Sequence, residues 1–292
     1  MKLRPATLDD AAAVASVFAA IELAIQGRSS FDEEAVHGWW QTVSLETNTW
    51  VFEEAGRIVA AAGGQLHGDR GNWAGGVHPD VQGRGIGAQL AALAEARLAE
   101  EGATRLHTWT VAGDVRADDL FTAHGYREVR RFWDMAIELS AEPPRAPAVP
   151  VSGFEEADAG AFHAALEEAF EDHWEPHPEP FEEWWDRQRG RRNFDPSLWF
   201  LIRDGDELAA VCRNEDRAEG GYIGALGVRR PWRGKGYGKA LLLHSFREFH
   251  RRGRRRVTLG VDAANPTGAT QLYKSVGMHA EQEFVVYEKL LA

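Results

Sequence analysis

Apolar and polar positions along the chain give the same order of predicted elements in each half. Apolar side chains at helical spacing over Ala11–Ile25 predict a first amphipathic helix. In the second half, residues 198–212 predict a β-hairpin around Asp204-Gly205-Asp206, because Asp-Gly favours a tight turn. Residues 222–228 predict the next strand, and residues 236–252 predict a long helix.

The second half continues with a predicted strand at 257–261, a helix at 267–275 and a strand at 284–287. The first half gives the same series: helices, a two-strand hairpin, a third strand, a glycine-rich turn, a long helix, and then strand, helix and strands. Helices that alternate with strands in this way are typical of α/β folds, in which helices cover a sheet. Each half is therefore expected to be an α/β unit around a mixed sheet.

This shared order reflects an internal repeat in the sequence itself. Three pairs of segments match in order at offsets of 149, 151 and 152 residues: Trp50–Phe52 with Trp199–Leu201, Val77–Gly87 with Val228–Gly238, and Phe121–Tyr126 with Tyr273–Met278. The pairs keep their order while the offset drifts by three residues, as small loop insertions produce. The chain is therefore interpreted as a tandem duplication.

Between the repeats lies a proline-rich stretch, Ala141–Pro150, which holds four of the 12 prolines in the chain. Proline fixes φ and removes a backbone donor, so this stretch is expected to be an extended connector. The predicted domains are an N-terminal unit over residues 1–140, the connector over residues 141–150, and a C-terminal unit over residues 151–292.

Length and composition agree with two cores and restrict the possible partners. The chain has 292 residues, which suits two domains of about 140. Its formal net charge of −12 disfavours general binding to nucleic acid or to anionic membranes, because such binding needs cations that neutralise phosphates. A single cysteine, Cys212, excludes an internal disulfide and a cysteine-rich zinc site. No secretory signal or membrane span is recognised, so a cytoplasmic location is expected.

The glycine-rich turn after each third strand is the strongest chemical signal in the sequence. In Arg233-Gly234-Lys235-Gly236-Tyr237-Gly238, glycines allow several N–H groups to converge, and the helix that follows adds its positive N-terminal dipole. Phosphate is the expected ligand. The glycine spacing excludes both a P-loop and the dinucleotide fingerprint. A tight turn without a ligand is the alternative, and the repetition of the loop with a basic residue inside it disfavours that alternative.

These residues resemble the acetyl-CoA pyrophosphate loop of the GCN5-related N-acetyltransferases, the GNAT superfamily. The resemblance rests on Gln82-x-x-Gly85-x-Gly87 and Arg233-x-x-Gly236-x-Gly238, each after a strand that ends in valine, and on Val261–Met278. It implies an α/β fold of two tandem GNAT-like units, each a mixed, mostly antiparallel twisted sheet flanked by helices. It also implies an N-acetyltransferase that uses acetyl-CoA as co-substrate and transfers the acetyl group directly in a ternary complex.

The resemblance assigns roles to particular residues of the second half. It implies that the strand edge at Leu226–Val228 pairs with the pantetheine arm, that Asn265 lies beside the cofactor, and that Tyr273 protonates the departing thiolate. A phenol with a pKa of about 10 suits this role, because it is still protonated at neutral pH. A tyrosine that only packs in the core is the alternative. The expected cofactor-binding residues are Leu226, Gly227, Val228, Arg233, Gly234, Lys235, Gly236, Tyr237, Gly238 and Lys239 in the second half, and Val77, Gln82, Gly83, Arg84, Gly85, Ile86 and Gly87 in the first.

A base for the acceptor amine is harder to identify. No carboxylate lies in residues 222–228, where many family members have one. The segment Asp172-His173-Trp174-Glu175 resembles the substrate-covering loop of the family, so these are the candidate acceptor-site residues, with the two acids and the histidine as candidate bases. Each could instead be a cap or a solvated loop residue. His173 and His177 have a spacing that suggests a metal, but Pro176 disfavours the helix that would align them, and no metal is expected.

The two repeats differ at the positions that the resemblance makes catalytic. The first repeat has Phe121 where the second has Tyr273, and Asp114 where the second has Asn265. Phenylalanine has no proton to donate, and Asp114 adds negative charge where the cofactor is expected. The hypothesis is that the C-terminal unit performs the turnover, while the N-terminal unit is catalytically degenerate and keeps its glycine loop for structure or for binding CoA.

Charge is distributed unevenly around the second glycine loop. Residues 229–256 contain 11 Lys or Arg and one acid, Glu248, so this stretch carries a local charge of +10. Nucleic-acid binding is one interpretation. In the preferred interpretation, the cations at the end of the stretch follow a helix C-terminus, where the helix dipole favours positive charge. Four others surround the cofactor phosphates: Arg230, Arg233, Lys235 and Lys239.

The expected partner is a small-molecule amine acceptor, with no nucleic acid and no membrane, and a monomer is preferred over a homodimer. A peptide N-terminus or lysine side chain with another acyl-CoA, and a non-catalytic acyl-CoA-binding protein, are the alternatives. Acidic residues between Glu167 and Glu175 suit a cationic amine, but also a solvated helix face. The pairs Trp39-Trp40 and Trp184-Trp185 are expected to pack in the cores rather than to stack on substrate.

Overall fold

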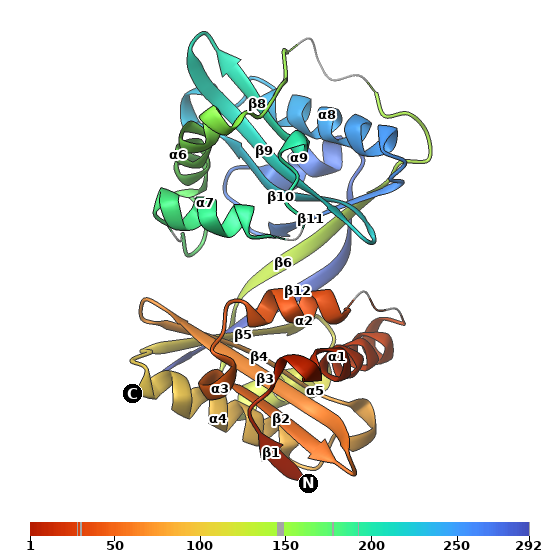
Figure 1. The fold of residues 1–292 in the computed structure, drawn as a ribbon, viewed down its shortest axis with the longest axis vertical. Coiled ribbons are helices and arrows are strands. Elements are labelled where there is room, and N and C mark those ends of the chain that lie inside the picture. Colours follow the sequence, from red (N-terminus) through yellow and green to blue (C-terminus); the bar gives the residue numbers. More distant parts are fainter. Residues whose placement is uncertain (28, 30, 145–148, 177, 192, 292) are drawn as a thin grey trace. The chain divides into compact units, whose positions relative to one another are not determined.

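The computed structural model describes residues 1–27, 29, 31–144, 149–176, 178–191 and 193–291, which form two compact units (Figure 1). The N-terminal unit contains Met1–Arg130 together with Phe284–Ala292, and the C-terminal unit contains Arg131–Glu283. The described part of the predicted connector, residues 141–144 and 149–150, has no helix or strand, and residues 145–148 lie outside the described residues.

The N-terminal unit is a mixed sheet in the order β1-β2-β3-β4-β5-β12, in which β4 and β5 are parallel and the other neighbours are antiparallel. Its strands are β1 (Lys2–Arg4), β2 (Thr49–Glu54), β3 (Arg57–His67), β4 (Arg70–Val77), β5 (Arg105–Val111) and the end of β12 (His279–Leu290). Its helices are α1 (Ala11–Gln26), α2 (Glu33–Trp40), α3 (Leu45–Asn48), α4 (Ile86–Glu100) and α5 (Val115–Ala123), with short 3-10 turns at Leu8–Asp10 and Pro79–Val81.

The C-terminal unit repeats this arrangement in the order β7-β8-β9-β10-β11-β6, in which β10 and β11 are parallel and the others antiparallel. Its strands are β6 (Arg127–Glu138), β7 (Ser152–Gly153), β8 (Trp199–Asp204), β9 (Glu207–Arg217), β10 (Gly220–Val228) and β11 (Arg256–Asp262). Its helices are α6 (Ala159–Phe170), α7 (Phe181–Arg189), α8 (Tyr237–Arg251) and α9 (Ala269–Ser275), with 3-10 turns at Glu156–Asp158, Pro196–Leu198 and Arg230–Trp232. The predicted hairpin, third strand and long helix of this unit are confirmed.

Helices cover both faces of each sheet because strand residues alternate in direction. In the N-terminal unit, Val51 packs in a cluster with α1 and α2, while its neighbour Phe52 packs in a cluster with α4. In the C-terminal unit, a Cβ on Gly221 would meet Phe249 of α8, whereas one on Gly227 would meet Ala169 of α6. We call these two sides of the C-terminal sheet the α8 face and the α6 face. Among the described residues, no helix has the length and hydropathy needed to cross a bilayer.

Each unit takes its last strand from the other half of the sequence. Residues 284–290 of β12 pair with β5, and Val285 and Tyr287 are buried in the N-terminal core beside Phe121. Residues 132–138 of β6 pair with β11, and Met135 is fully buried in the C-terminal core. The compact units therefore do not share the boundaries 1–140 and 151–292 of the two repeats. Strands that are so far apart in the sequence can pair without any signal in the local residue pattern. The sequence repeat therefore did not reveal that the two units exchange their last strands.

Candidate active site

The C-terminal glycine loop joins β10 to α8 and presents a row of backbone amides. Gly234 and Gly236 have φ values of +79° and +82°, a left-handed conformation that L-residues with a side chain rarely adopt. Gly236 is the N-cap of α8, so the next amides belong to the first helical turn and have no carbonyl one turn below them. The Arg233 side chain fixes the loop, because its Nε donates to the Val228 carbonyl at 3.2 Å. This geometry suits an anion at the start of α8.

The N-terminal loop has the same backbone geometry. Gly83 and Gly85 have φ values of +76° and +78°, and Gly85 is the N-cap of α4. Gln82 lies at the position of Arg233, and its Nε2 donates to the Val77 carbonyl at 3.0 Å, which is the matching anchor. The two loops therefore have the same backbone conformation and the same kind of anchor, although the anchor is Arg233 in one loop and Gln82 in the other.

The basic residue inside each glycine loop forms an ion pair with an acidic residue of the same unit. Arg84 pairs with Glu54 at 3.1 Å, and Lys235 pairs with Asp204 at 3.4 Å, where each acid ends the first strand of the hairpin. The last glycine of each loop allows close packing, since a Cβ on Gly238 would lie 2.9 Å from a Leu272 methyl group of α9. Tyr237 and Ile86 begin the two helices, and Lys239 is exposed in the first turn of α8.

The third strand of each unit has an open edge next to the loop. In the C-terminal unit, β10 pairs with β11 at Gly221 and Tyr222, so the stretch from Ile223 to Val228, which includes Leu226 and Gly227, extends past the parallel ladder. The strand also bulges at Gly224, where the register with β9 shifts. In the N-terminal unit, β4 pairs with β5 at residues 70–72 and keeps a continuous register with β3. The added Gly224 accounts for one residue of the drift in the repeat offset.

Tyr273 lies on α9 in the core of the C-terminal unit with 8% of its surface exposed. Burial raises the pKa of its phenol above the ordinary value, and charge on Cys212 and Tyr222 adds to this effect. The phenol is therefore protonated at neutral pH and is held by packing in the core.

Asn265 shapes the turn that leads into α9. Its Oδ1 accepts from the backbone N–H of Thr267 at 2.9 Å and from the Thr267 hydroxyl at 2.6 Å, while its own N–H donates to the Asp262 carbonyl at 3.0 Å. The side-chain amide keeps its N–H₂ group as a donor. The observed contacts therefore give Asn265 a structural role in the turn that carries Tyr273.

The matching positions of the N-terminal unit are built differently. Phe121 is buried on α5 among aromatic rings, with Trp73 at 5.9 Å and Tyr287 at 5.1 Å between ring centroids. Asp114 caps α5, because its carboxylate accepts from the Ala117 N–H at 3.1 Å. Two tyrosine rings lie beside Phe121, and both hydroxyls have partners: that of Tyr126 accepts a hydrogen bond from Trp73 Nε1 at 2.8 Å, and that of Tyr287 donates to Asp118 Oδ1 at 2.5 Å.

A cavity of about 800 Å³ lies in this N-terminal unit rather than beside Tyr273. It extends from Gln82–Gly87 along the open edge of β4 to Phe121, and its far side is lined by apolar residues of α1 and α2, including Phe18 and Trp39. This size is in the range of small-molecule sites. The cavity supports ligand binding in the N-terminal unit, whereas the tyrosine at the matched helix position belongs to the C-terminal unit.

The segment after α6 contributes the candidate acceptor residues. Asp172 accepts hydrogen bonds from Arg230 and Arg233 at 2.7 Å, and these bonds lower the pKa of its carboxyl to about 2. Such a group is a weak base at neutral pH. His173 stacks on Phe170 with ring centroids 4.2 Å apart, and burial lowers the pKa of its imidazole below the ordinary value. Of these two side chains, His173 is the one that is neutral and able to accept a proton at neutral pH.

The strand exchange brings residues to this site that sequence reasoning missed. Trp174 contacts Phe132 of β6, with ring centroids 6.1 Å apart. Asp134, two residues further on β6, is opposite Gly260 of β11, and a Cβ on Gly260 would lie 3.6 Å from Asp134 Oδ1 and 3.9 Å from the Tyr222 hydroxyl. Phe132 and Asp134 belong to the first repeat, so the order of motifs gave no signal for them. Glu175 adopts a φ of +56° beside this segment, and His177 lies outside the described residues.

Ion pairs balance the basic stretch Arg229–Arg256. Arg229 binds Glu168 at 2.6 Å, and Arg230 binds Glu171 at 2.8 Å as well as Asp172. The guanidinium groups of Arg230 and Arg233 both bind Asp172 and so hold the end of α6 to the loop, and the ring of cations around phosphate stays a prediction. The same pairs occupy acidic residues that were expected to attract a cationic amine.

The tryptophan pairs divide between packing and lining a cavity. Trp184 and Trp185 are buried against Phe162 and Trp199, with the prediction of core packing confirmed for this pair. Trp40 is also buried, whereas Trp39 lines the N-terminal cavity. The prediction that both tryptophans pack in the core is therefore incomplete for Trp39. Its position in the predicted helix did not distinguish it from Trp40.

Comparison with known proteins gives consistent matches over both repeats. The model of the acetyltransferase (GNAT) family matches residues 17–126 and 162–278. Mycothiol acetyltransferase of Streptomyces scabiei is 33% identical over 219 residues, which cover 73% of this chain and 67% of that protein. Mycothiol acetyltransferase of Corynebacterium efficiens is 30% identical over 281 residues, with 91% and 88% covered. The crystal structure of a GCN5-related N-acetyltransferase from Sphaerobacter thermophilus superimposes with a TM-score of 0.87 at 32% identity, with 99% of this chain and 95% of that chain covered.

Proposed function

The chain belongs to the GNAT family of acetyltransferases, and we propose that its C-terminal unit transfers the acetyl group of acetyl-CoA to a primary amine of a small molecule. Membership makes the protein an N-acetyltransferase with two GNAT units. Relatives that are named mycothiol acetyltransferases support a small-molecule acceptor. The acceptor and the mechanism are the parts of this function that we infer from the residues.

The observation that carries the proposal is the state of Tyr273. Its side chain is buried in the core of the unit, and burial raises the pKa of its phenol, so it remains protonated at neutral pH. A general acid needs this combination, because it must donate a proton to a leaving thiolate while excluding water. The N-terminal unit has Phe121 at this position and so lacks the donor.

The residues around Tyr273 fit the co-substrate. Acetyl-CoA supplies an activated acetyl group as a thioester, together with a pyrophosphate that needs hydrogen-bond donors. The amides of residues 234–239 form such a set of donors at a helix N-terminus, and the edge of β10 from Ile223 to Val228 offers backbone groups to an amide-bearing arm. The N-terminal loop and its cavity have the same features, so we propose that Val77 and Gln82–Gly87 also bind CoA.

Direct transfer in a ternary complex agrees with the state of Cys212. A covalent route needs an exposed nucleophile with a lowered pKa. Cys212 is fully buried, and burial raises the pKa of its thiol to about 12. Its Sγ also donates to Asn214 Oδ1 at 3.3 Å. The one cysteine of the chain is therefore unsuited to carry the acetyl group.

We propose His173 as the group that removes a proton from the acceptor amine. Changing His173 to glutamine is expected to lower kcat by about 10- to 100-fold at pH 7, because glutamine cannot accept the proton. The loss is expected to shrink as pH rises, since the amine then loses its proton to solvent. A pH profile of kcat for both proteins at saturating amine tests this expectation. Profiles of the same shape and height would contradict the role of His173.

A matched pair of glycine variants separates the two loops. A Cβ at Gly236 would meet no neighbouring atom within 4 Å, so the expected effect of valine comes from the φ of +82°, a strain that moves the loop amides. Gly236→Val is expected to raise KM for acetyl-CoA by at least about 10-fold. Gly85→Val, with the same strain at +78°, is expected to leave kcat and KM within about twofold while calorimetry shows one bound CoA instead of two. Loss of turnover in folded Gly85→Val would show that the units cooperate in catalysis.

A further inference from the structure

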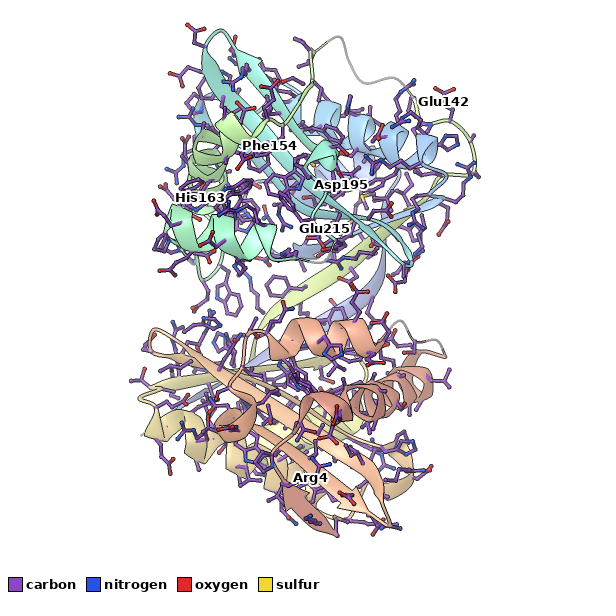
Figure 2. All side chains as sticks on the ribbon, viewed as in Figure 1. Arg4, Glu142, Phe154, His163, Asp195 and Glu215 are labelled. Carbon is purple, nitrogen blue, oxygen red and sulfur yellow. The ribbon has the colours of Figure 1, made fainter. Side chains whose placement is uncertain are left out.

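Three arginines converge on one buried carboxylate on the α6 face of the C-terminal sheet. Glu215 of β9, which Figure 2 labels, has 5% of its side chain exposed and accepts from Arg191 Nη1 at 2.7 Å and from Arg217 Nη2 at 2.8 Å. Arg213 also contacts its carboxylate, and Asn193 Nδ2 donates to it at 3.3 Å. We call Arg191, Arg213 and Arg217 the arginine cluster.

The arginine cluster contains more positive charge than its partner can balance. Burial raises the pKa of Glu215, but the charges of Arg213, Arg217 and Arg191 outweigh burial and hold that pKa at about 2. The carboxylate is therefore ionised, and among the described residues it is the one acid in an ion pair with Arg191, Arg213 or Arg217, so two of the three positive charges stay unbalanced. Arg187, whose charge also acts on Arg191, has its own partner in Glu179. Each guanidinium also has more N–H donors than its bonds to Glu215 use.

The arginine cluster lies along the strand that the proposed reaction uses. A Cβ on Gly224, at the bulge of β10, would lie 2.8 Å from Arg213 Nη2. The Arg217 guanidinium lies 3.4 Å from the centre of the Tyr222 ring. The Tyr222 hydroxyl would lie 3.9 Å from a Cβ on Gly260 of β11, the parallel neighbour of β10. The cluster therefore lies against β10 on the α6 face, and the free edge of this strand is the one that the proposed reaction uses.

The N-terminal unit has no equivalent of this cluster. Strand β3 matches β9 in the repeat, but the sequence from Ile58 to Asp69 contains no arginine and no glutamate. A charge network needed only to hold the fold is expected in both units, because the two sheets have the same order. Its presence in the unit that has Tyr273, and not in the unit that has Phe121, points to a role in the reaction of the C-terminal unit.

We propose that the arginine cluster binds an anionic group of the acceptor, a carboxylate or a phosphate, and so selects amines that carry one. This inference rests on the proposed function, because it concerns the acceptor of the same site. Arg217 and Arg191, with 41% and 33% of their side chains exposed, are the members that a ligand can reach. Paired N–H donors of a guanidinium match the oxygens of either anion, and such charge-assisted bonds are stronger than neutral ones.

Kinetics with matched acceptors test the selection. Amino acids are compared with their carboxamides, and O-phosphoethanolamine with ethanolamine, by following CoA release. The anionic member of a pair is expected to have at least about 10-fold higher kcat/KM. Arg217→Gln is expected to lower this value by about 10- to 100-fold, mainly through KM, and to leave the neutral member within about twofold. Arg251→Gln is the control, because Arg251 is an exposed residue of α8 paired with Glu248. Equal use of both members by the wild type, or equal loss for both in Arg217→Gln, would overturn the proposal.

A binding measurement separates this inference from the proposed function. With CoA saturating both glycine loops, inorganic phosphate at constant ionic strength is expected to raise the unfolding midpoint of the wild type and of Arg251→Gln, but not of Arg217→Gln. If no amine releases CoA while this difference is seen, the proposed reaction fails and the anion site stands. If amines are acetylated but phosphate acts equally on all three proteins and no anionic acceptor is preferred, the anion site is wrong.

Discussion

Replacing Tyr273 with phenylalanine is expected to lower kcat by about 10- to 10⁴-fold, the range that general acid catalysis contributes. The substitution removes one oxygen from a side chain that is 8% exposed and that is held by packing, so the surrounding core keeps its shape. Raised by burial, the pKa of this phenol keeps the proton available across the neutral range. KM for acetyl-CoA is expected to change little, because the proposed contacts to the cofactor come from the loop and the edge of β10.

The matched control for this variant is Tyr126→Phe. Tyr126 is buried to a similar extent, at 4%, and its hydroxyl accepts a bond from Trp73 in the other unit. Tyr126→Phe is expected to lower the free energy of unfolding by about 1 kcal/mol, because it loses this hydrogen bond, and to leave kcat unchanged. Single-turnover measurements with saturating amine are the decisive test, since they isolate the chemical step. Unchanged turnover in Tyr273→Phe would remove Tyr273 from the role of acid.

A substitution near the C-terminus is expected to destabilise the N-terminal unit. Tyr287→Ala should lower the free energy of unfolding of that unit by about 3–5 kcal/mol, the cost of removing a large buried aromatic side chain. Tyr287 is 7% exposed, its ring lies 5.1 Å from that of Phe121, and its hydroxyl donates to Asp118 at 2.5 Å. A loss of this size is a large fraction of the total free energy of unfolding of a domain.

Hydrogen exchange read by mass spectrometry locates the effect. In Tyr287→Ala, amides of β4, β5 and α4 are expected to exchange faster, while those of α8 and β10 keep their protection. Tyr287→Phe keeps the ring and loses the bond to Asp118, so it is expected to show a loss of about 1 kcal/mol. Faster exchange confined to the C-terminal unit would mean that β12 completes its own repeat and that the strand exchange is incorrect.

The elements of each unit could be predicted because local patterns decide them. The hairpin around Gly205 is marked by Asp-Gly, and Gly236 marks the start of α8 because a left-handed residue is needed there. Tyr273 and Phe121 could be compared in advance because a repeat aligns them without a structure. By contrast, the acceptor side depends on side chains from separate segments, and residues such as Phe132 and Arg213 have no motif of their own.

The sequence by itself determined that this chain is a tandem repeat with two glycine loops and with a tyrosine in one repeat where the other has phenylalanine, because short-range spacing and self-similarity encode these features, and its motifs carry the resemblance to the acetyltransferase family. Only the tertiary structure decided that each unit borrows its last strand, that Asp172 is held by arginines while His173 is not, and that three arginines share Glu215. Strand pairing, burial and ion pairs depend on residues that are far apart in the chain. Their free energies arise only once the fold brings those residues together.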